Sequence, residues 1–404
     1  MFSIIGLYRK SFSNLNRNTW ILALAMLINR SGAMVLIFTS LYLTKNLHFS
    51  IAQAGVIMSF YGVGSILGSY AGGWLTDRRD HFSIMFYSLI SSGSILILML
   101  FASEQWFVSL VIFLYAFTSD LFRPANSAAI ASYSTIENRT RSVSLIRLAI
   151  NLGFSVGPAI GGFVAIHLGY HLLYIIDSLT SFAAAALLYF YLPRNPTVAT
   201  VQSKAVLSDN KTSAYKDYSY LLFIFFVALF GICFFQLFAT VPLYFNKECH
   251  FSEDTIGLLL ALNGLLVVLI EMPMVAYLEN SKELFKYIIR GAIFLPISFL
   301  VLKIGNGMLL FAIIYTFTLT FSEIFAMPFM MNYALSKPVK ERQGQYAALY
   351  SIAYGISNIL APIVGMGIAS YYGFDTLFTW LILLGTVVAV GFFMIKIKHA
   401  NQQH

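Results

Sequence analysis

The chain has 404 residues, of which 59% are hydrophobic and 10% are charged, with a mean hydropathy of +0.77. A soluble domain carries about 25% charged residues, so this balance excludes a soluble fold and indicates an integral membrane protein. The net charge of +8 does not indicate a nucleic-acid partner, because basic residues are expected to border membrane segments. The two cysteines, Cys233 and Cys249, lack the spacing of a metal or redox site.

Twelve segments are long and apolar enough to span a bilayer, which takes about 20 residues. Residues 1–19 lack the sustained apolar core of a secretory signal, so the first segment is expected to remain in the mature protein. Long unbroken runs predict helices rather than a barrel, hence an all-α membrane protein. In chain order the predicted segments are 19–44, 53–76, 83–103, 106–134, 142–167, 170–192, 218–245, 255–278, 285–304, 307–335, 344–370 and 375–395.

The second group of six segments repeats the first. The stretch "LYLTKNLHFSIAQAG" (41–55) aligns with "LYFNKECHFSEDTIG" (243–257), and "GPAIGG" (157–162) aligns with "APIVGM" (361–366). We therefore expect two six-helix halves, 1–193 and 218–404, joined by a flexible cytoplasmic linker at 194–217. Halves with the same orientation are related by a pseudo-two-fold axis along the membrane normal, with a substrate site between them near mid-membrane.

The distribution of lysine and arginine predicts the orientation. With the N-terminus in the cytoplasm, nineteen of the 25 basic residues fall on the cytoplasmic side and three on the other, namely Lys45, Lys247 and Lys303. This bias places both termini in the cytoplasm. The short chain and the lack of glycosylated outer loops favour a bacterial inner membrane.

The loop between the second and third segments reads "GGWLTDRRDHF" (72–82). It resembles the loop signature of the major facilitator superfamily, Gly-x-Leu-Ala-Asp-Arg-x-Gly-Arg-Lys, through Gly73, Leu75, Asp77 and Arg78. Asp80 replaces the second glycine, and the closing basic pair is absent. The resemblance implies that Asp77 gates the cytoplasmic side, with Gly73 and Arg78 in the same loop; the alternative is a solvated loop charge.

The fifth segment carries "GFSVGPAIGG" (153–162), in which Gly153, Gly157 and Gly161 recur on one helical face and allow close approach of another helix. Pro158 removes one backbone hydrogen bond and permits a bend. The pattern resembles a signature of drug/proton antiporters, which favours export and a gating role for these residues. Ordinary helix packing, equally compatible with an importer, is the alternative; a second run, Gly64, Gly68 and Gly72, is interpreted as packing only.

Charged residues inside the membrane segments mark candidate sites, because a buried charge needs a cavity or a partner. Arg30 lies about 18 Å into the first segment, near the midplane. Asp120 and Arg123 share a face of the fourth segment at i,i+3 spacing. The remaining intramembrane charges are Arg147, Asp177, Glu271 and Glu323. Four acids against three bases leave one surplus carboxyl group, and such a group in a low-dielectric site can take up a proton near neutral pH.

In the superfamily, helices one, four, seven and ten line the central cavity. The resemblance therefore assigns to the cavity Asn29, Arg30, Asp120, Arg123, Gln236 and Glu323. Arg30 is expected to face Asp120 or a substrate, with a static salt bridge as the alternative. The run "FSEIFAMP" resembles a Gly-Glu-x-x-x-x-Pro pattern of certain multidrug antiporters, so Glu323 is the first choice for proton coupling, followed by Glu271 and Asp120.

These features predict a secondary active transporter that exports amphipathic or aromatic small molecules in exchange for protons. The alternatives are a proton-coupled importer of a small nutrient or peptide, and a non-transporting receptor or assembly factor. No catalytic set or ATP-hydrolysing domain is recognisable, so we expect no enzyme activity and no cofactor. His167 and His171 are better explained as interfacial residues than as metal ligands. The expected partners are a small-molecule substrate, protons and the lipid bilayer, and the protein is expected to act as a monomer.

Overall fold

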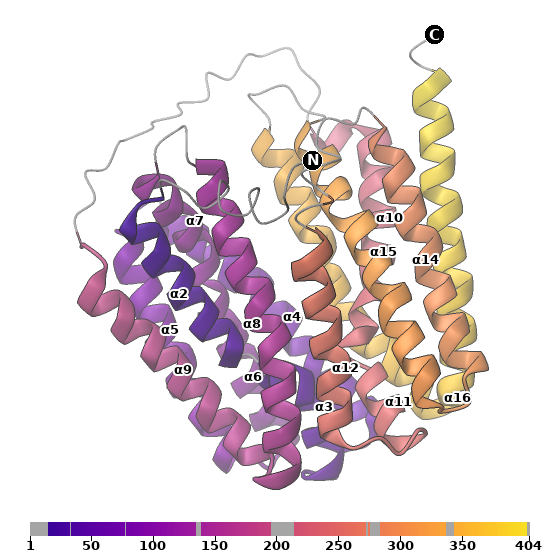
Figure 1. Ribbon diagram of the computed structural model, residues 1–404, viewed down its shortest axis with the longest axis horizontal. Helices are drawn as coiled ribbons and strands as arrows, with labels where there is room; N and C mark the ends of the chain where they lie inside the picture. Colours follow the sequence, from indigo (N-terminus) through magenta and orange to yellow (C-terminus); the bar gives the residue numbers. More distant parts are fainter. Residues whose placement is uncertain are drawn as a thin grey trace, which may run out of the picture. The chain divides into compact units, whose positions relative to one another are not determined.

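The computed structural model describes residues 15–32, 34–76, 78–134, 139–194, 214–271, 274, 283–336 and 343–401 (Figure 1). Every regular element within these ranges is helical. The chain forms two compact units, one of Met1–Phe38 with Val63–Val201 and the other of Thr39–Gly62 with Gln202–His404. We call them unit 1 and unit 2.

Unit 1 is built around contacts of α2 with α8 and α9, and of α5 with α6, α7 and α9. Its core contains fully buried side chains such as Leu22, Met85 and Leu188. The helices that contribute to it are α2 (Arg17–Gly32), the start of α3 (Val35–Lys45), the second part of α4 (Ile51–Thr76), α5 (His81–Ile97), α6 (Gln105–Asp120), α7 (Phe122–Tyr133), α8 (Arg139–His167) and α9 (Tyr170–Tyr191).

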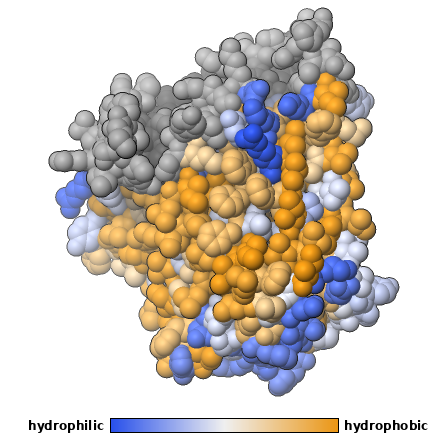
Figure 2. Space-filling model, turned by 45° about the vertical axis from the view of Figure 1, so that its right-hand side comes forward, coloured by the Kyte–Doolittle hydropathy of each residue, from blue (hydrophilic) through white to orange (hydrophobic). Residues whose placement is uncertain are grey.

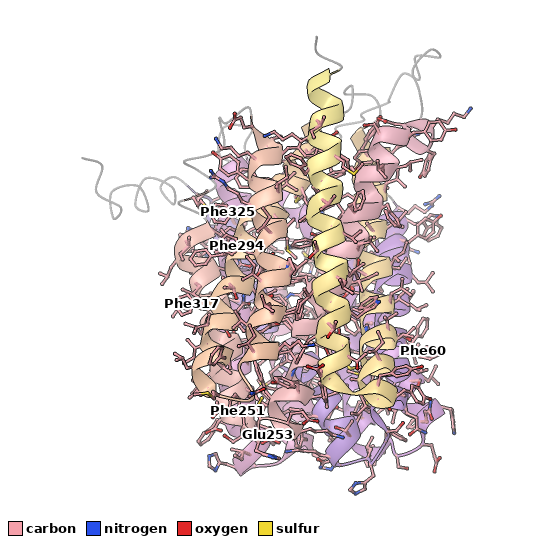
Figure 3. All side chains as sticks on the ribbon, turned by 90° about the vertical axis from the view of Figure 1, so that its right-hand side faces the viewer. Phe60, Phe251, Glu253, Phe294, Phe317 and Phe325 are labelled. Carbon is pink, nitrogen blue, oxygen red and sulfur yellow. The ribbon has the colours of Figure 1, made fainter. Side chains whose placement is uncertain are left out.

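In unit 2, α14 packs against α15 and α16, and α10 packs against α16. Aromatic residues run along α14 and α15, where Phe294 and Phe325 stack with ring centroids 6.3 Å apart (Figure 3). The unit contains the end of α3, the first part of α4, α10 (Tyr218–Phe234), the 3-10 turn η3 (Phe235–Leu237), α11 (Val241–Lys247), α12 (Glu253–Leu266), the π-helical segment η4 (Val267–Glu271), α14 (Leu284–Ile304), α15 (Leu309–Ser336) and α16 (Gln343–Asn401).

Over the described residues the predicted membrane segments coincide with these helices, and the end of the segment 255–278 lies largely outside the described residues. Among the described residues, 11 helices are long and apolar enough to cross a membrane, and the last, Ala348–Ile397, covers most of the predicted segment 344–370 and all of 375–395. Gly373 interrupts it with a non-helical backbone, φ 84° and ψ 167°. The all-α membrane fold is therefore confirmed. Hydrophobic residues cover much of the described surface in view in Figure 2, and hydrophilic residues lie toward both its lower and its upper end.

Two turns repeat along the chain as the sequence predicts. His48 and His250, which are 202 residues apart, both adopt positive φ values of 57° and 56°. Gly169 and Gly373, which are 204 residues apart, have φ values of 87° and 84°. These spacings equal the offsets of the two aligned stretches, so the internal repeat extends to backbone conformation.

The compact units differ from the predicted halves at one place. Residues 39–62, which the helix count assigns to the first half, pack with the second unit. The linker predicted at 194–217 lies largely outside the described residues. The division into 1–193 and 218–404 therefore stays a prediction.

Candidate functional site

The predicted glycine stripe of α8 faces α2 within unit 1. A Cβ atom added to Gly153 would lie 2.6 Å from the Arg30 Cβ, and one added to Gly161 would lie 2.8 Å from the Met34 Cβ. At Gly157 the nearest atom is the carbonyl oxygen of Ser31, at 3.0 Å. Because no side chain fits in these gaps, the stripe brings the α2 backbone, and Arg30 with it, directly against α8.

The Arg30 guanidinium is poorly satisfied at this position. Its Cζ lies 5.7 Å from the ring centroid of Phe154, and its Nε is buried without a hydrogen-bond partner. Within the described part of the chain it forms no ion pair within 4.0 Å, although Asp177 of α9 is close enough to act on it electrostatically. Arg30 as a whole is half-buried, and a charged side chain in this state within a membrane segment is a candidate for a functional site.

Asp120, predicted to face Arg30, has other partners in the structure. Its side chain is buried, accepts a hydrogen bond from the Ser65 hydroxyl of α4, and pairs with Arg123 at 3.3 Å. The predicted i,i+3 pair is thus present, whereas the predicted Arg30–Asp120 pair is not among the contacts. The reason is local: Arg123 is three residues away, and α4 supplies a second donor to the same carboxylate.

Asp177 occupies the place beside Arg30 that the sequence interpretation gave to Asp120. Its side chain is 1% exposed, and its Oδ2 accepts a hydrogen bond from the Tyr115 hydroxyl at 3.3 Å. Gly32 allows α2 to approach, since a Cβ there would lie 3.1 Å from the Asp177 Oδ1. On the same side of α2, Asn29 donates to the Ser181 hydroxyl at 3.3 Å. No sequence feature singled out Tyr115, because it is an aromatic residue within an apolar helix.

Glu323 of α15 lies in a polar cluster of unit 2. Its Oε2 accepts a hydrogen bond from the Asn263 amide of α12 at 3.2 Å, and the same amide donates to the Thr320 hydroxyl at 2.9 Å. Among the described residues no Lys or Arg forms an ion pair with it. Asn263 was missed by the sequence interpretation, although an asparagine inside the apolar run "ALNGLLVVL" was a usable signal.

Glu271 is the second carboxyl group of this cluster. It is 5% exposed and ends the π-helical segment η4. It acts electrostatically on Glu323, and it has further contacts of its own. Short π-helical insertions are frequent at functional sites, because they shift a side chain out of the regular helical register.

Each unit places a carboxyl group of one helix against a polar side chain of another helix. In unit 1, Asp120 of the fourth segment bonds to Ser65 of the second, and in unit 2, Glu323 of the tenth bonds to Asn263 of the eighth. The difference is the cation: Arg123 pairs with Asp120, whereas Glu323 is held by an uncharged amide.

Gln236 does not have the exposure expected of a cavity residue. It is 0% exposed, and its amide nitrogen donates to the carbonyl oxygens of Ile232 and Ala361 at 3.1 and 2.9 Å. Its Oε1 accepts from the Thr240 hydroxyl at 2.7 Å. These hydrogen bonds join η3 to α16 inside unit 2, and the cavity role of Gln236 stays a prediction.

The loop signature is only partly described. Asp77 lies outside the described residues. The Arg78 guanidinium stacks on the Trp74 ring, 4.1 Å from its centroid, and donates to the Trp74 carbonyl oxygen at 3.2 Å. A Cβ on Gly73 would meet no atom within 4 Å, and Asp80 caps the start of α5 by accepting from the Ser83 amide at 2.8 Å. Asp80, one of the departures from the signature, thus serves to begin a helix.

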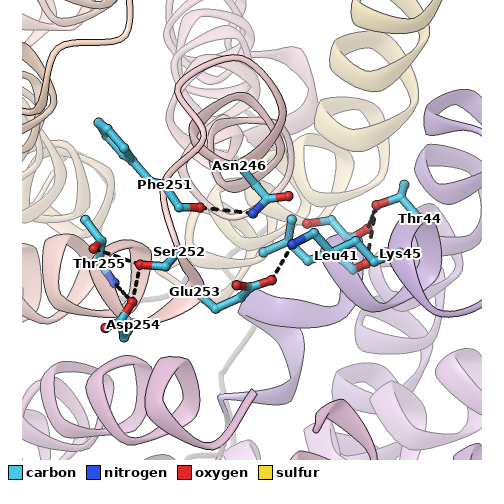
Figure 4. A network of polar contacts seen from close by, with 10 residues as sticks. Leu41, Thr44, Lys45, Asn246, Phe251, Ser252, Glu253, Asp254 and Thr255 are labelled. Carbon is cyan, nitrogen blue, oxygen red and sulfur yellow. Dashed lines mark hydrogen bonds and ion pairs between the residues drawn. The ribbon is translucent and has the colours of Figure 1, made fainter. Parts of the chain in front are cut away.

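An ion pair that the sequence interpretation missed links the two turns of the repeat within unit 2. Lys45, at the end of α3, donates to Glu253 at the start of α12 at 2.6 Å (Figure 4). The Glu253 side chain is 8% exposed, whereas that of Lys45 is 39% exposed. A Cβ on Gly55 of α4 would lie 2.6 Å from the Pro362 carbonyl oxygen of α16, so α4 and α16 also touch closely here.

Comparison with known proteins gives the family. The chain is 23% identical to a Na(+), Li(+), K(+)/H(+) antiporter of Planococcus maritimus, over 92% of this chain and 93% of that protein. It is 23% identical to multidrug resistance protein 2 of Bacillus subtilis, over 80% and 81% of the two chains. The fold is similar to that of a POT peptide transporter bound to alafosfalin, with a TM-score of 0.79 and 17% identity, over 95% of this chain and 96% of that chain. Residues 20–362 match the Major Facilitator Superfamily, and the chain belongs to that superfamily.

Proposed function

We propose that this protein is a proton-coupled antiporter that exports amphipathic or aromatic small molecules by alternating access. Membership of the superfamily and similarity to a named antiporter and a named multidrug resistance protein support this proposal. The observation that carries it is the environment of Glu323, a carboxyl group held by the neutral Asn263 amide with no described ion pair.

In this proposal the carboxyl groups of Asp120 and Glu323 have different tasks. Asp120, with the Arg123 guanidinium and the Ser65 hydroxyl beside it, is a fixed anion of the site. Glu323 has an uncharged donor, so it can alternate between a protonated and an ionised form. The ionised form attracts a cargo and the protonated form releases it. Because the cargo and the proton cannot occupy Glu323 at the same time, the two fluxes are coupled. Glu271, beside Glu323, is the next candidate for the same task.

The gate proposed for the cytoplasmic loop rests on the matched signature residues Gly73, Asp77 and Arg78. Asp77→Asn removes the charge and keeps the shape of the side chain. We expect this variant to lose transport while retaining expression and ligand binding. Unchanged transport by Asp77→Asn would mean that the altered loop no longer gates.

Proteoliposomes with an acidic interior test the proposed exchange. Addition of ethidium, tetraphenylphosphonium or Na⁺ outside should release internal protons, read from an entrapped pH-sensitive dye. Glu323→Gln should abolish this release while retaining ethidium binding, since the amide keeps the size of the side chain. Glu104→Gln, at an exposed helix N-cap without a side-chain hydrogen bond, is the matched control and should behave as the wild type.

The outcomes separate the candidate functions. Proton release at the wild-type level by Glu323→Gln would exclude Glu323 as the coupling residue and direct the test to Glu271 or Asp120. Probe accumulation together with protons would favour an importer. Absence of flux for a folded protein with the whole probe panel, extended to short peptides, would favour a receptor or assembly factor.

A further inference from the structure

We propose that Asp177 of α9 is a second proton-binding group of the transport cycle, with Arg30 and Tyr115 as its partners in unit 1. The inference rests on the proposed proton coupling, and it adds a site that the charge balance of the sequence did not assign. It predicts that each unit contributes one exchanging carboxyl group, Asp177 in unit 1 and Glu323 in unit 2.

The first observation is the burial of Asp177 with incomplete compensation. The side chain is 1% exposed, and its one described hydrogen bond comes from the neutral Tyr115 hydroxyl at 3.3 Å. An ionised carboxylate in a dry interior needs two or more good donors or a hydrogen-bonded cation to be stable. A carboxyl group with one long neutral hydrogen bond is therefore suited to hold a proton.

The second observation is the state of Arg30. Its guanidinium acts on Asp177 electrostatically but forms no ion pair within 4.0 Å with it, and the Arg30 Nε is buried without any partner. A buried ion pair stabilises a fold only when its geometry is good and its remaining donors are satisfied. This pair satisfies neither condition, so its contribution to stability does not explain why two opposite charges lie inside unit 1.

Among the described residues, the groups that act on the Asp177 carboxyl group are the Tyr115 hydroxyl and the Arg30 guanidinium. Arg30 comes from α2 and Tyr115 from α6. α5 approaches this part of α9 through Gly93, whose added Cβ would lie 3.1 Å from the Ser178 carbonyl oxygen, and α8 places Phe154 against Arg30. The proton affinity of Asp177 is therefore set mainly by one movable guanidinium and one hydroxyl.

This arrangement provides a simple switch. When Asp177 is ionised, Arg30 is drawn toward it; when a proton from water binds to an Asp177 carboxyl oxygen, the attraction is lost and Arg30 is released. Arg30 packs directly against Gly153 of α8, so a change in the position of Arg30 alters the contact between α2 and α8. Protonation at Asp177 is thereby linked to packing at the glycine stripe.

Infrared difference spectroscopy of the membrane-reconstituted protein tests the inference without a cargo. Stepping the pH from acid to alkaline should remove the carbonyl bands of protonated carboxyl groups in the wild type. Asp177→Asn should lack one component of this change, Glu323→Gln should lack a different one, and the double variant should lack both. Glu104→Gln should retain the two components.

A second variant separates proton binding from a structural role. Asp177→Asn leaves Arg30 without its anion, so Arg30→Gln/Asp177→Asn should restore the thermal stability of the protein. If Asp177 exchanges protons, the double variant should still lack its infrared component and move one proton fewer per ethidium in the proteoliposome assay. Full wild-type spectra and proton ratio in this stable double variant would overturn the inference. A change confined to Glu323→Gln would support the proposed function and reject the role of Asp177.

Discussion

At the scale of single residues, the carboxyl groups of Asp120 and Glu323 differ in the charge of their neighbours. Asp120 has an arginine three residues away and a serine hydroxyl from α4, whereas Glu323 has an asparagine amide. A hydroxyl that bonds to a charged group contributes more to stability than one that bonds to a neutral group. The contact between Ser65 and Asp120 is therefore both a stability determinant and the simplest test of the charge of Asp120.

Ser65→Ala should destabilise the protein by about 1–3 kcal/mol, because it removes a donor from a buried carboxylate. Ser94→Ala is the control: Ser94 is exposed, and its hydroxyl donates only to the Ile90 carbonyl oxygen of its own helix. Thermal unfolding of both variants in detergent, followed by tryptophan fluorescence, gives the comparison. Equal unfolding temperatures for the two variants would contradict an ionised Asp120.

The sequence predicted the local contacts of the site and missed those that depend on tertiary structure. The Asp120–Arg123 pair follows from helical spacing alone. The proximity of Arg30 and Asp177, which are far apart in sequence, depends on how α2 and α9 rotate about their own axes, and Gly32 sets that contact. Helical periodicity does not fix such a rotation when a helix is apolar on every face.

At the scale of helices, glycine stripes determine which elements touch. Gly64 and Gly68 of α4 face the Phe113 and Phe117 carbonyl oxygens of α6, which confirms the interpretation of that run as packing. The glycine stripe of α8 faces α2, and Gly153 of this stripe packs against Arg30. A glycine stripe thus serves packing alone in α4, whereas in α8 it lies against the half-buried Arg30.

Gly153→Ala should destabilise the protein by about 1–3 kcal/mol through overpacking, because its Cβ would lie 2.6 Å from the Arg30 Cβ. Gly367→Ala in α16 is the matched control, since an added Cβ there meets no atom within 4 Å. That variant should be neutral or gain up to about 1 kcal/mol from helix propensity. Thermal unfolding of the pair measures the difference, and an equally tolerated Gly153→Ala would contradict the close approach of α2 and α8.

The Lys45–Glu253 pair joins α3 to α12 and should be coupled more strongly than an exposed pair. Lys45→Ala leaves the nearly buried Glu253 carboxylate without its cation, so it should cost more stability than Lys45→Ala/Glu253→Gln. The control cycle uses Lys286 and Glu283, which pair at 2.8 Å with both side chains exposed. A coupling energy at Lys45–Glu253 no larger than at the exposed pair would show that the contact does not hold the two turns together.

At the scale of the whole molecule, composition and repetition predicted the helices, whereas the compact units depend on tertiary contacts. Long apolar runs fix where helices lie, and aligned turns such as His48 and His250 fix the repeat. The assignment of residues 39–62 to unit 2 depends on contacts such as Gly55 against Pro362 and Lys45 against Glu253. A helix count cannot predict those contacts, because a helix can begin in one unit and end in the other.

Orientation in the membrane rests on the distribution of basic residues, and the protein carries a native probe for it. Cys249 lies in the turn between α11 and α12, beside Lys247, on the side predicted to face outward. It is half-buried near Gly307, while Cys233 is fully buried within α10. An impermeant thiol reagent added to intact cells should therefore report on Cys249 alone.

We expect this reagent to label the wild type in intact cells and to leave Cys249→Ser unlabelled. Burial raises the pKa of the Cys249 thiol, so the reactive thiolate becomes more abundant, and labelling faster, as the pH rises through the alkaline range. Arg79→Cys in the Cys249→Ser background should be labelled only after permeabilisation, because Arg79 is exposed on the predicted cytoplasmic side. The reverse pattern, with Arg79→Cys labelled in intact cells and Cys249 protected, would invert the topology and move the proposed gate at Asp77 to the outer face.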